Sequence, residues 1–555
     1  MLAPSKNKCR IKTQRQVSVL RWEDVELGSE IKSYLDYLSL SSTKDRMHKM
    51  TRVSKPKKFA VISSTDLTLP GATSTEDQVL ELDCAALVAR IRDGSLRAEQ
   101  VCEKLLQQHE RYRSLNAITW IDESLVIASA RNIDKARDKG VRLPMLAGLP
   151  ILVKDNIDTV GVPTSAGTSS LKQHFPVENS PVVKCLLRQG VIVFGKANMH
   201  ELGIGVTSTN PTFGFVRNPY NPDLIAGGSS GGSAAAIAAR IVPAALGTDT
   251  GGSIRIPAAF CGIVGFRPSI FPRPLYSQEG VVPLSLDLDT IGPMGRSTAD
   301  VALLHATIVG SRPIRPRTLK TVRIGIPKLS HWGDLDPEIE RVTQLALDRL
   351  HDQGTVFIEI DLREIRATAV QAFSAISSEF VVQLQKFLHE HVPSVSLGAL
   401  TEQIASRDVR AAVERVTSTG PNPSLLTARS GDRDRIRAAY REVFKKYRID
   451  AITFPTTVLT PPPVRTAGDD ANDLIKFNGR SITKHTTIVR NAESAVIFGA
   501  PALSIPAGLT GRGLPVALEF DGLPGKDRAL LALGLAVEAA IGRLPAPSPR
   551  VVSMA

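Results

Sequence analysis

The chain has 555 residues, of which 43% are hydrophobic, so it can bury the core of a large globular enzyme. Its net charge of +13 comes mostly from residues 1–60, which hold 14 Lys and Arg against 6 Asp and Glu. That segment lacks the aromatic and basic interleaving of a nucleic-acid module. No uninterrupted apolar run approaches the roughly 18 residues of a membrane helix, and the N-terminus has no hydrophobic signal core. We therefore expect no nucleic-acid and no membrane partner.

The cysteines favour a reducing compartment. There are five of them, an odd number at irregular spacing, which argues against a disulfide framework. None of the spacings is that of a zinc site, and His200-Glu201 lacks the second histidine of a zinc-protease motif. We expect a cytoplasmic protein with no metal and no cofactor. The five cysteines are Cys9, Cys84, Cys102, Cys185 and Cys261.

Helical and strand patterns alternate along the chain, which is typical of an α/β fold with a layered sheet. Apolar spacing predicts two helices between Thr75 and Arg113, broken near Asp93. The long segment 337–446 is polar and helix-rich. Further strands are expected at 114–121, 147–156, 191–199, 321–328, 450–458 and 501–509, and further helices at 124–140, 182–190, 231–247, after Arg296, and at 528–544.

Two serine sites flanked by glycine stand about two dozen residues apart in the stretch from Gly227 to Pro268, GGSSGGSAAAIAARIVPAALGTDTGGSIRIPAAFCGIVGFRP. Glycine lets backbone N–H groups approach a reacting atom closely, and serine can act as a nucleophile when a base removes its proton. A lysine lies upstream in LAGLPILVKDNIDTVGVPTSAGT, directly after an apolar run. Desolvation disfavours the charged form of a lysine, so Lys154 is a candidate base. These residues predict an acyl-transfer site that works without histidine.

This constellation resembles the amidase signature family of serine hydrolases over roughly Leu80 to Pro545. The resemblance implies a single large α/β/α layered fold with a mixed central sheet. It also implies a catalytic triad of Lys154, Ser229 and Ser253, with a cis peptide before Ser229. In such a triad Ser253 is the nucleophile and Ser229 relays its proton to Lys154. Backbone N–H groups of Thr250, Gly251, Gly252 and Ser253 would form the oxyanion hole, and supporting roles would fall to Asp249, Arg255 and Ser230.

The domain organisation follows from where the resemblance starts and stops. We expect a basic N-terminal extension over 1–75, an amidase domain over 76–546 and a tail over 547–555. Within the amidase domain, 310–450 is expected to be a helix-rich variable cap. The extension could hold a short helix over 24–40, or translation could start at Met47 or Met50.

Two other readings of the motif stay open. Gly228 to Gly232 matches the G-x-S-x-G nucleophile elbow, with Ser230 as nucleophile. That elbow needs a preceding strand, and PYNPDLIAGG is interrupted by proline, which strands disfavour. A catalytically inactive scaffold is the other reading, and the complete triad argues against it.

The substrate is less specified than the chemistry. MHELGIGVTSTN and RIPAAFCGIVGFRP look most like the indoleacetamide and mandelamide hydrolase branch, which implies a small primary amide carrying an aryl group. Pocket contacts are expected from Met199, His200 and Thr207. The alternative is the glutamine-hydrolysing subunit of a tRNA-dependent amidotransferase, although His200 and Arg267 depart from that pattern. A small-molecule amide is the expected partner, with a homodimer as an open assembly.

Overall fold

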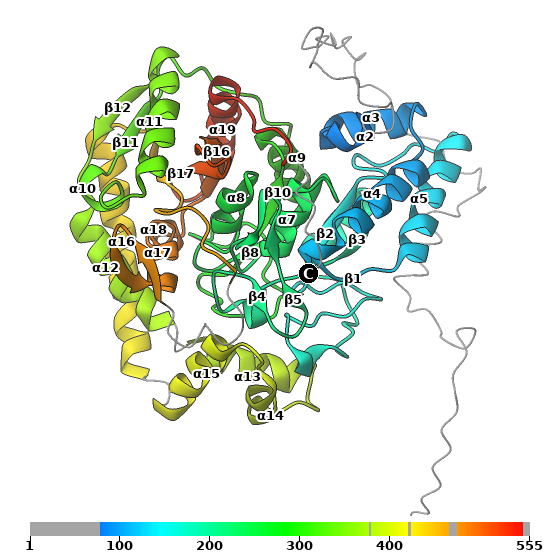
Figure 1. Ribbon diagram of the computed structural model, residues 1–555, viewed down its shortest axis with the longest axis horizontal. Helices are drawn as coiled ribbons and strands as arrows, with labels where there is room; N and C mark the ends of the chain where they lie inside the picture. The colour runs from blue at the N-terminus through cyan, green and yellow to red at the C-terminus, as the bar shows by residue number, and fades with distance from the viewer. Residues whose placement is uncertain (1–77, 377–378, 420–422, 465–473, 548–555) are drawn as a thin grey trace, which may run out of the picture. The chain divides into compact units, whose positions relative to one another are not determined.

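A computed structural model describes residues 78–376, 379–419, 423–464 and 474–547 (Figure 1). The predicted extension over 1–75, its helix over 24–40, and residues 548–555 lie outside the described residues. The described residues belong to one compact unit, Gly71–Ala555. Within these ranges no helix combines the length and the apolar character that a membrane span needs.

An 11-stranded mixed sheet runs through this unit in the order β1-β3-β2-β8-β10-β9-β16-β17-β13-β11-β12. Pairing is parallel among β3, β2 and β8 and among β13, β11 and β12, and antiparallel elsewhere. The predicted α/β fold with a mixed sheet is confirmed. The strands are β1 (Ile118–Trp120), β2 (Pro150–Lys154), β3 (Ile192–Ala197), β8 (Ala244–Asp249), β9 (Val264–Arg267), β10 (Thr290–Gly295), β11 (Arg323–Ile326), β12 (Val356–Glu359), β13 (Ala451–Pro455), β16 (Ala502–Leu509) and β17 (Pro515–Asp521).

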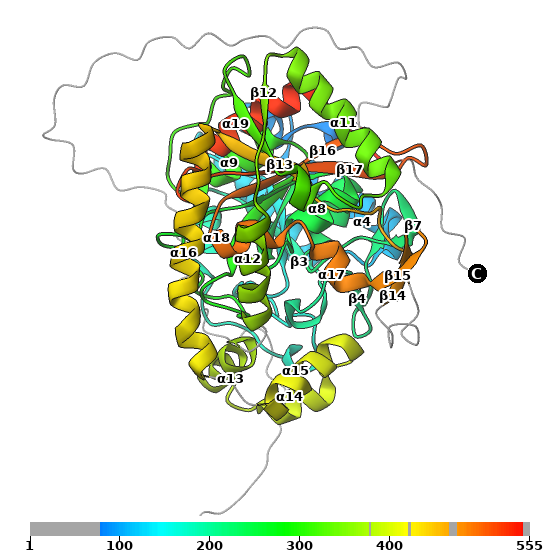
Figure 2. The same ribbon diagram turned by 90° about the vertical axis from the view of Figure 1, so that its left-hand side faces the viewer.

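Helices cover both faces of the sheet, so apolar side chains of the sheet are buried on each side. The helices α9 (Thr298–Ile308), α11 (Pro337–Asp352) and α19 (Asp527–Ile541) share one buried apolar cluster with strands of the sheet, and α11 and α19 are seen in the upper part of Figure 2. The helices α12 (Arg363–Ile376) and α18 (Glu493–Phe498) share another cluster, which includes Phe454 of β13, and α8 (Arg255–Cys261) lies against β16 and β17. The remaining described helices near the sheet are α2 (Gln78–Glu81), α3 (Cys84–Asp93), α4 (Ala98–Arg111), α5 (Glu123–Asp138), α6 (Pro181–Arg188), α7 (Gly231–Ala238), α10 (Lys328–His331), α16 (Pro423–Tyr447) and α17 (Lys484–Val489).

The predicted helix over 231–247 is wrong in its second half. The helix α7 ends at Ala238, and β8 starts at Ala244 and runs into the site. Arg240 adopts a left-handed φ of 63°, and Pro243 has no N–H to continue a helical hydrogen-bond ladder. Small residues on both sides hid this boundary, because alanine suits a buried helix and a buried strand of this size equally.

Besides β8, the strands β9, β10, β12 and β17 of the main sheet and the short strands outside it were not expected. Asn221–Ile225 forms β7, which pairs with β6 (Arg217–Asn218) in a ribbon outside the main sheet, although proline argued against a strand there. The segment 337–446 is helix-rich as predicted, but it also contributes β12 at the edge of the main sheet, where it pairs only with β11. An edge position tolerates such a half-exposed segment.

A second group of helices falls within 310–450, the segment expected to be a cap, and this group is called the cap below; β11, β12 and α11 of the same segment belong instead to the main sheet and the helices that cover it. In both views α13 (Glu379–His391), α14 (Leu397–Gln403) and α15 (Arg407–Thr419) lie together at the bottom of the molecule. Their apolar side chains form one cluster with Ala166, Leu171, Leu202 and Val282 from loops around the site. The small pairs β4 (Thr209–Asn210) with β5 (Gly214–Phe215), and β14 (Leu474–Phe477) with β15 (Arg480–Thr483), complete the described elements.

Candidate active site

The predicted lysine and the first serine meet in the interior. Lys154 is the last residue of β2, and β8 runs parallel beside it, so the carboxyl ends of both strands reach the same edge of the site. Lys154 Nζ lies 2.8 Å from Ser229 Oγ and 2.8 Å from Thr248 Oγ1. The Asn156 side chain also donates to Thr248 Oγ1, at 3.1 Å. Hydroxyl oxygens thus fix the position of the lysine nitrogen.

Burial changes the acid–base character of this lysine. Lys154 has no exposed surface, and desolvation lowers its pKa to about 7. The carboxylates of Asp249 and Asp289 act in the opposite direction and keep the pKa from falling further. About half of the side chains would therefore be neutral at pH 7, against roughly one in 2,500 for a lysine in water. This is the environment that a lysine base needs.

Ser229 is held through its backbone. The Gly228–Ser229 peptide, expected to be cis, is cis in the structure. The Ser229 carbonyl accepts the backbone N–H of His200 at 3.1 Å and the hydroxyl of Ser208 at 3.2 Å. The Ser229 hydroxyl thereby faces the lysine from a loop that neighbouring segments anchor.

Ser253 lies in a loop that the Asp249 carboxylate organises. Asp249 Oδ1 accepts the Gly252 N–H at 3.0 Å, and Oδ2 accepts the Ile254 N–H at 3.2 Å. The Gly252 N–H is therefore occupied within the loop, which removes it from the four oxyanion donors expected. The N–H groups of Gly251 and Ser253, and the Ser253 hydroxyl, have no hydrogen-bond partner among the described residues.

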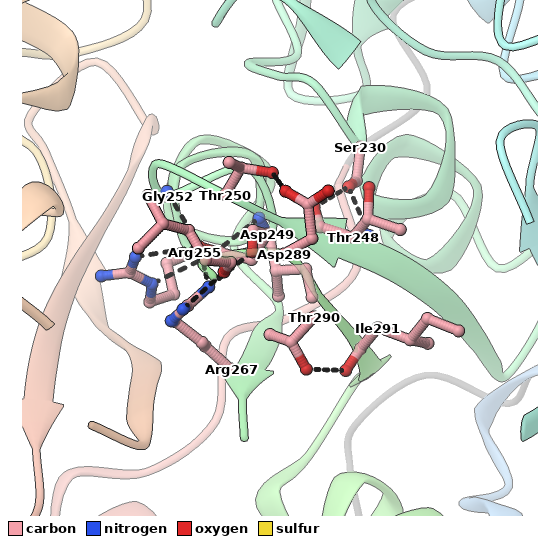
Figure 3. A network of polar contacts seen from close by, with 12 residues as sticks. Ser230, Thr248, Asp249, Thr250, Gly252, Arg255, Arg267, Asp289, Thr290 and Ile291 are labelled. Atoms are coloured by element: carbon pink, nitrogen blue, oxygen red, sulfur yellow. Dashed lines mark hydrogen bonds and ion pairs between the residues drawn. The ribbon is translucent and has the colours of Figure 1, made fainter. Parts of the chain in front are cut away.

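Two buried arginines hold that carboxylate in turn (Figure 3). Arg255 binds Asp249 through two bonds of 3.1 Å and also pairs with Glu519. Arg267 donates to Asp249 Oδ1 at 3.1 Å and to the Leu288 carbonyl at 2.8 Å. Burial alone would raise the pKa of Asp249, but the two guanidinium groups outweigh it and hold the pKa below its usual value. Asp249 is therefore a fixed anion beneath the Ser253 loop.

Ser230 has a structural place. Its hydroxyl donates to the Thr248 carbonyl at 3.2 Å and accepts the Thr248 N–H at 3.3 Å (Figure 3). Its backbone N–H donates to the Ser253 carbonyl at 3.1 Å. The side chain is fully buried and joins the start of α7 to β8. A hydroxyl that is bonded to both the N–H and the carbonyl of Thr248 is not presented to a substrate, as a nucleophile elbow would require.

The three residues expected in the pocket are all buried, and one of them, His200, reaches the cap. His200 Nδ1 accepts the Ser208 N–H at 3.2 Å and lies 3.2 Å from Thr207 Oγ1. Because Nδ1 is an acceptor, Nε2 carries the proton, and it lies 3.2 Å from Asp408 Oδ2 in α15. Met199 lies beside Gly203: its Cε atom is 3.8 Å from a methyl group built on that glycine, the same distance as Ser229 Oγ.

Sequence reasoning missed several residues around the triad. A methyl group built on Gly203 would lie 3.4 Å from Leu284 Cδ1 and 3.8 Å from both Met199 Cε and Ser229 Oγ. Leu284, Met199 and Ser229 therefore all lie around Gly203, and the two apolar side chains are called the wall at Gly203 below. Thr248 could have been found from its place next to Asp249 in the motif, since alternate residues of a strand face opposite sides. Leu284 had no local signal.

Comparisons with known proteins show which family this chain resembles. The Amidase family model matches residues 100–531. An indoleacetamide hydrolase of Agrobacterium vitis is 37% identical over 82% of this chain and 96% of its own length. A mandelamide hydrolase of Pseudomonas putida is 34% identical over 85% of this chain and 94% of its own length. A crystal structure of an amidase superposes with a TM-score of 0.73 at 29% identity, over 83% of this chain and all of that one.

The chain therefore belongs to the amidase signature family. It is an amidase, a hydrolase that acts on amides.

Proposed function

We propose that this amidase hydrolyses the C–N bond of a small primary carboxamide bearing an aryl group, through a Ser–cis-Ser–Lys triad. The observation that carries the proposal is the contact of 2.8 Å between Lys154 Nζ and Ser229 Oγ at a lysine whose pKa is about 7. A neutral amine at this distance can take the Ser229 proton. The bonds from Nζ to Thr248 leave its lone pair free to face Ser229.

In the proposed acylation, Ser253 Oγ attacks the amide carbon while its proton passes to Ser229 and the Ser229 proton passes to Lys154. The carbonyl oxygen becomes an oxyanion, for which the N–H groups of Gly251 and Ser253 are the free donors, with Thr250 beside them. The C–N bond then breaks, and the proton on Lys154 returns through Ser229 to the leaving nitrogen, which departs as ammonia. Catalytic hydrogen bonds often tighten only with substrate bound, which accounts for a Ser253 hydroxyl without a partner beforehand.

Deacylation repeats the same steps with water. Water attacks the acyl carbon, its proton passes through Ser229 to Lys154, the Ser253 ester bond breaks, and Lys154 returns a proton through Ser229 to Ser253 Oγ. The product leaves as a carboxylate. No metal or cofactor is needed for the balance of atoms and charge.

The aryl preference rests on two supports. Leu284 and Met199 make the wall at Gly203 apolar, and such walls discriminate substrates by about 1–3 kcal/mol. The second support is that relatives spanning most of the chain are named for indoleacetamide and mandelamide, both aryl-substituted primary amides. We infer the same substrate class here.

The test is ammonia release from a panel of aryl and aliphatic primary amides, measured for the wild type and Ser253→Ala. We expect activity on indole-3-acetamide or phenylacetamide, and a loss of at least about 10³-fold in Ser253→Ala, since the nucleophile is gone. Circular dichroism should show the fold retained. Near-normal turnover by Ser253→Ala would sink the mechanism. Glutamine hydrolysis that appears only with partner subunits would favour the amidotransferase alternative instead.

We also propose that the protein works in the cytoplasm. In the described part of the chain the cysteines Cys84, Cys102, Cys185 and Cys261 are all free thiols, which suits a reducing compartment. Cell fractionation followed by immunoblotting tests this, and recovery outside the cytoplasm would contradict it. The homodimer and the absence of a nucleic-acid partner stay predictions, to be checked by light scattering and by nucleic-acid binding assays.

A further inference from the structure

Asp289 is a buried carboxylate beside the site that belongs to neither serine motif. It precedes β10, which pairs antiparallel with β8 so that Thr290 lies opposite Asp249. This register carries Asp289 to Thr250, at the start of the Ser253 loop. Thr250 Oγ1 donates to Asp289 Oδ1 at 2.5 Å (Figure 3). The other carboxylate oxygen accepts backbone N–H groups of residues 284 and 285, at 2.7 and 3.0 Å.

The segment 284–285 lies near Ser229, because Leu284 and Ser229 both lie around Gly203. Ser285 donates its hydroxyl to Glu379 Oε2 at 2.7 Å, and Glu379 is the first residue of the cap helix α13. A single carboxylate thus connects the Ser253 loop, the wall at Gly203 and the cap.

Asp289 also faces the charged groups of the site. Its carboxylate raises the pKa of Lys154, in the same direction as Asp249 and against the effect of burial. Burial raises the pKa of Asp289 itself, while its three hydrogen-bond donors and Arg267 act in the opposite direction. Both of its oxygens accept hydrogen bonds, which is the arrangement of an ionised carboxylate.

We propose that Asp289 is a positioning residue for the hydrolysis, one that fixes Thr250 in the Ser253 loop to the wall at Gly203 and sets the charge around Lys154. The inference rests on the proposed function, since it assigns Asp289 to the reaction of that triad. It does not act on the substrate directly. Misplacing a reacting group by about 1 Å can cost about 100-fold in rate, so a tie of this kind matters to kcat.

Two variants separate its two effects, and a third is the control. Asp289→Asn removes the charge but keeps an oxygen for the two backbone N–H groups and an amide for Thr250. Thr250→Val removes the hydroxyl of the tie but leaves the charge and the backbone N–H. Asp287→Asn removes a carboxylate two residues away on the same segment, where it is exposed and pairs with Arg433 at 2.6 Å.

The expected results differ in kind. In Asp289→Asn the acidic limb of kcat/KM should shift to lower pH, because losing a negative charge lowers the pKa of Lys154. In Thr250→Val kcat should fall about tenfold or more with KM within about threefold, because the loop serves the transition state. The acidic limb of Thr250→Val should stay in place, and Asp287→Asn should match the wild type in both measurements.

An acidic limb of Asp289→Asn that superimposes on the wild-type limb would overturn the charge effect. A kcat of Thr250→Val within about twofold of wild type would overturn the tie. Thr250→Val decides alone if Asp289→Asn does not fold. The Ser253→Ala variant tests the proposed function separately. An active Ser253→Ala variant would overturn the proposed triad. An inactive Ser253→Ala variant, together with Asp289→Asn and Thr250→Val variants that behave like the wild type, would overturn only this inference.

Discussion

Lys154 shows how position decides the chemistry of a residue. In sequence it is one of 68 basic residues, and in the structure it is a fully buried amine at the end of β2. Its environment balances desolvation, which favours the neutral form, against two nearby carboxylates, which favour the charged one. The balance leaves the pKa at about 7, within the range where a base exchanges protons readily.

This balance predicts the pH dependence of the enzyme. In the proposed mechanism Lys154 acts as a base when neutral, so kcat/KM should rise as pH increases through about 7 and level off above it. The measurement is a profile of kcat/KM against pH with a neutral amide, whose own charge does not change. Asp287→Asn serves again as the control, with an unchanged profile. A rate that is flat between pH 5 and pH 9 would show that the titration of Lys154 does not limit the reaction.

The Asp249 cluster works in a different way from the lysine. Its carboxylate receives two backbone N–H groups and two guanidinium groups, so it stays ionised and orders the loop around Ser253. Removing one partner of such a buried pair typically costs about 3–5 kcal/mol, because a buried charge is left uncompensated. The residues that shape the loop are thus also residues that the fold depends on.

At the scale of elements, α7 lies unusually close to the strand and loop beside it. A methyl group built on Gly232 would lie 2.3 Å from the Asn198 carbonyl oxygen and 2.4 Å from the Ala117 carbonyl oxygen. Both are backbone atoms, so no side chain can move aside. The small residues of GGSAAAIA therefore serve close packing of α7, in addition to the turn at its start.

We predict that Gly232→Ala lowers the thermal unfolding midpoint and the activity together, because α7 must move away and takes Ser229 and Ser230 with it. The matched control is Gly398→Ala, also near the start of a helix, where the nearest atom is 4.0 Å away. Alanine there should stabilise slightly, by about 0.5–1 kcal/mol. Differential scanning calorimetry measures the unfolding midpoints of the two variants, and steady-state kinetics measures their activity. An unfolding midpoint of Gly232→Ala equal to wild type would contradict the packing argument.

Two consecutive residues, His200 and Glu201, connect the cap to the segment beside Ser229. The Glu201 carboxylate accepts backbone N–H groups of Ala405 and Ser406, directly before α15. His200 reaches Asp408 in the first turn of the same helix. Since the His200 backbone also holds the Ser229 carbonyl, the cap and the bridging serine share one anchor.

At the scale of the whole molecule, the central sheet gathers the site from distant segments. Parallel β2 and β8 bring Lys154 to Thr248, and antiparallel β10 and β9 bring Asp289 and Arg267 to the far side of Asp249. The N-terminal segment that holds α2 contacts Arg296, the residue that follows β10. The Arg296 side chain donates to the backbone carbonyls of Leu80 and Leu82.

These contacts predict the effect of truncation. A chain lacking residues 1–75 keeps α2 and its contacts with Arg296, so its kcat/KM should stay within about twofold of the full chain. A chain lacking residues 1–93 loses α3, whose Cys84, Leu87 and Ile91 are buried in the core, and should not fold. Steady-state kinetics and circular dichroism of both truncations are the measurements. A large loss of activity in the first truncation would give the basic extension a role in catalysis.

The sequence by itself predicted the type of fold, most helices and strands, and the identity of the motif residues. Those predictions rest on local patterns: apolar periodicity for the elements, and glycine, serine and lysine at characteristic places for the chemistry. It missed β9, β10, β12 and β17 of the main sheet. It also failed at the end of α7, at β8 and at β7, where small residues and proline made the local pattern ambiguous.

Only the tertiary structure brought in Thr248, Leu284 and Asp289, and only it showed that the Gly252 N–H is occupied by Asp249. Apart from Thr248, whose place next to Asp249 in the motif was a signal, none of these roles follows from neighbours in the chain, because each depends on which strands pair and in what register. The same holds for the pKa of Lys154, since desolvation is a property of everything packed around the amine. Residue types determined which chemistry is available here, and strand pairing and burial decided which groups can carry it out.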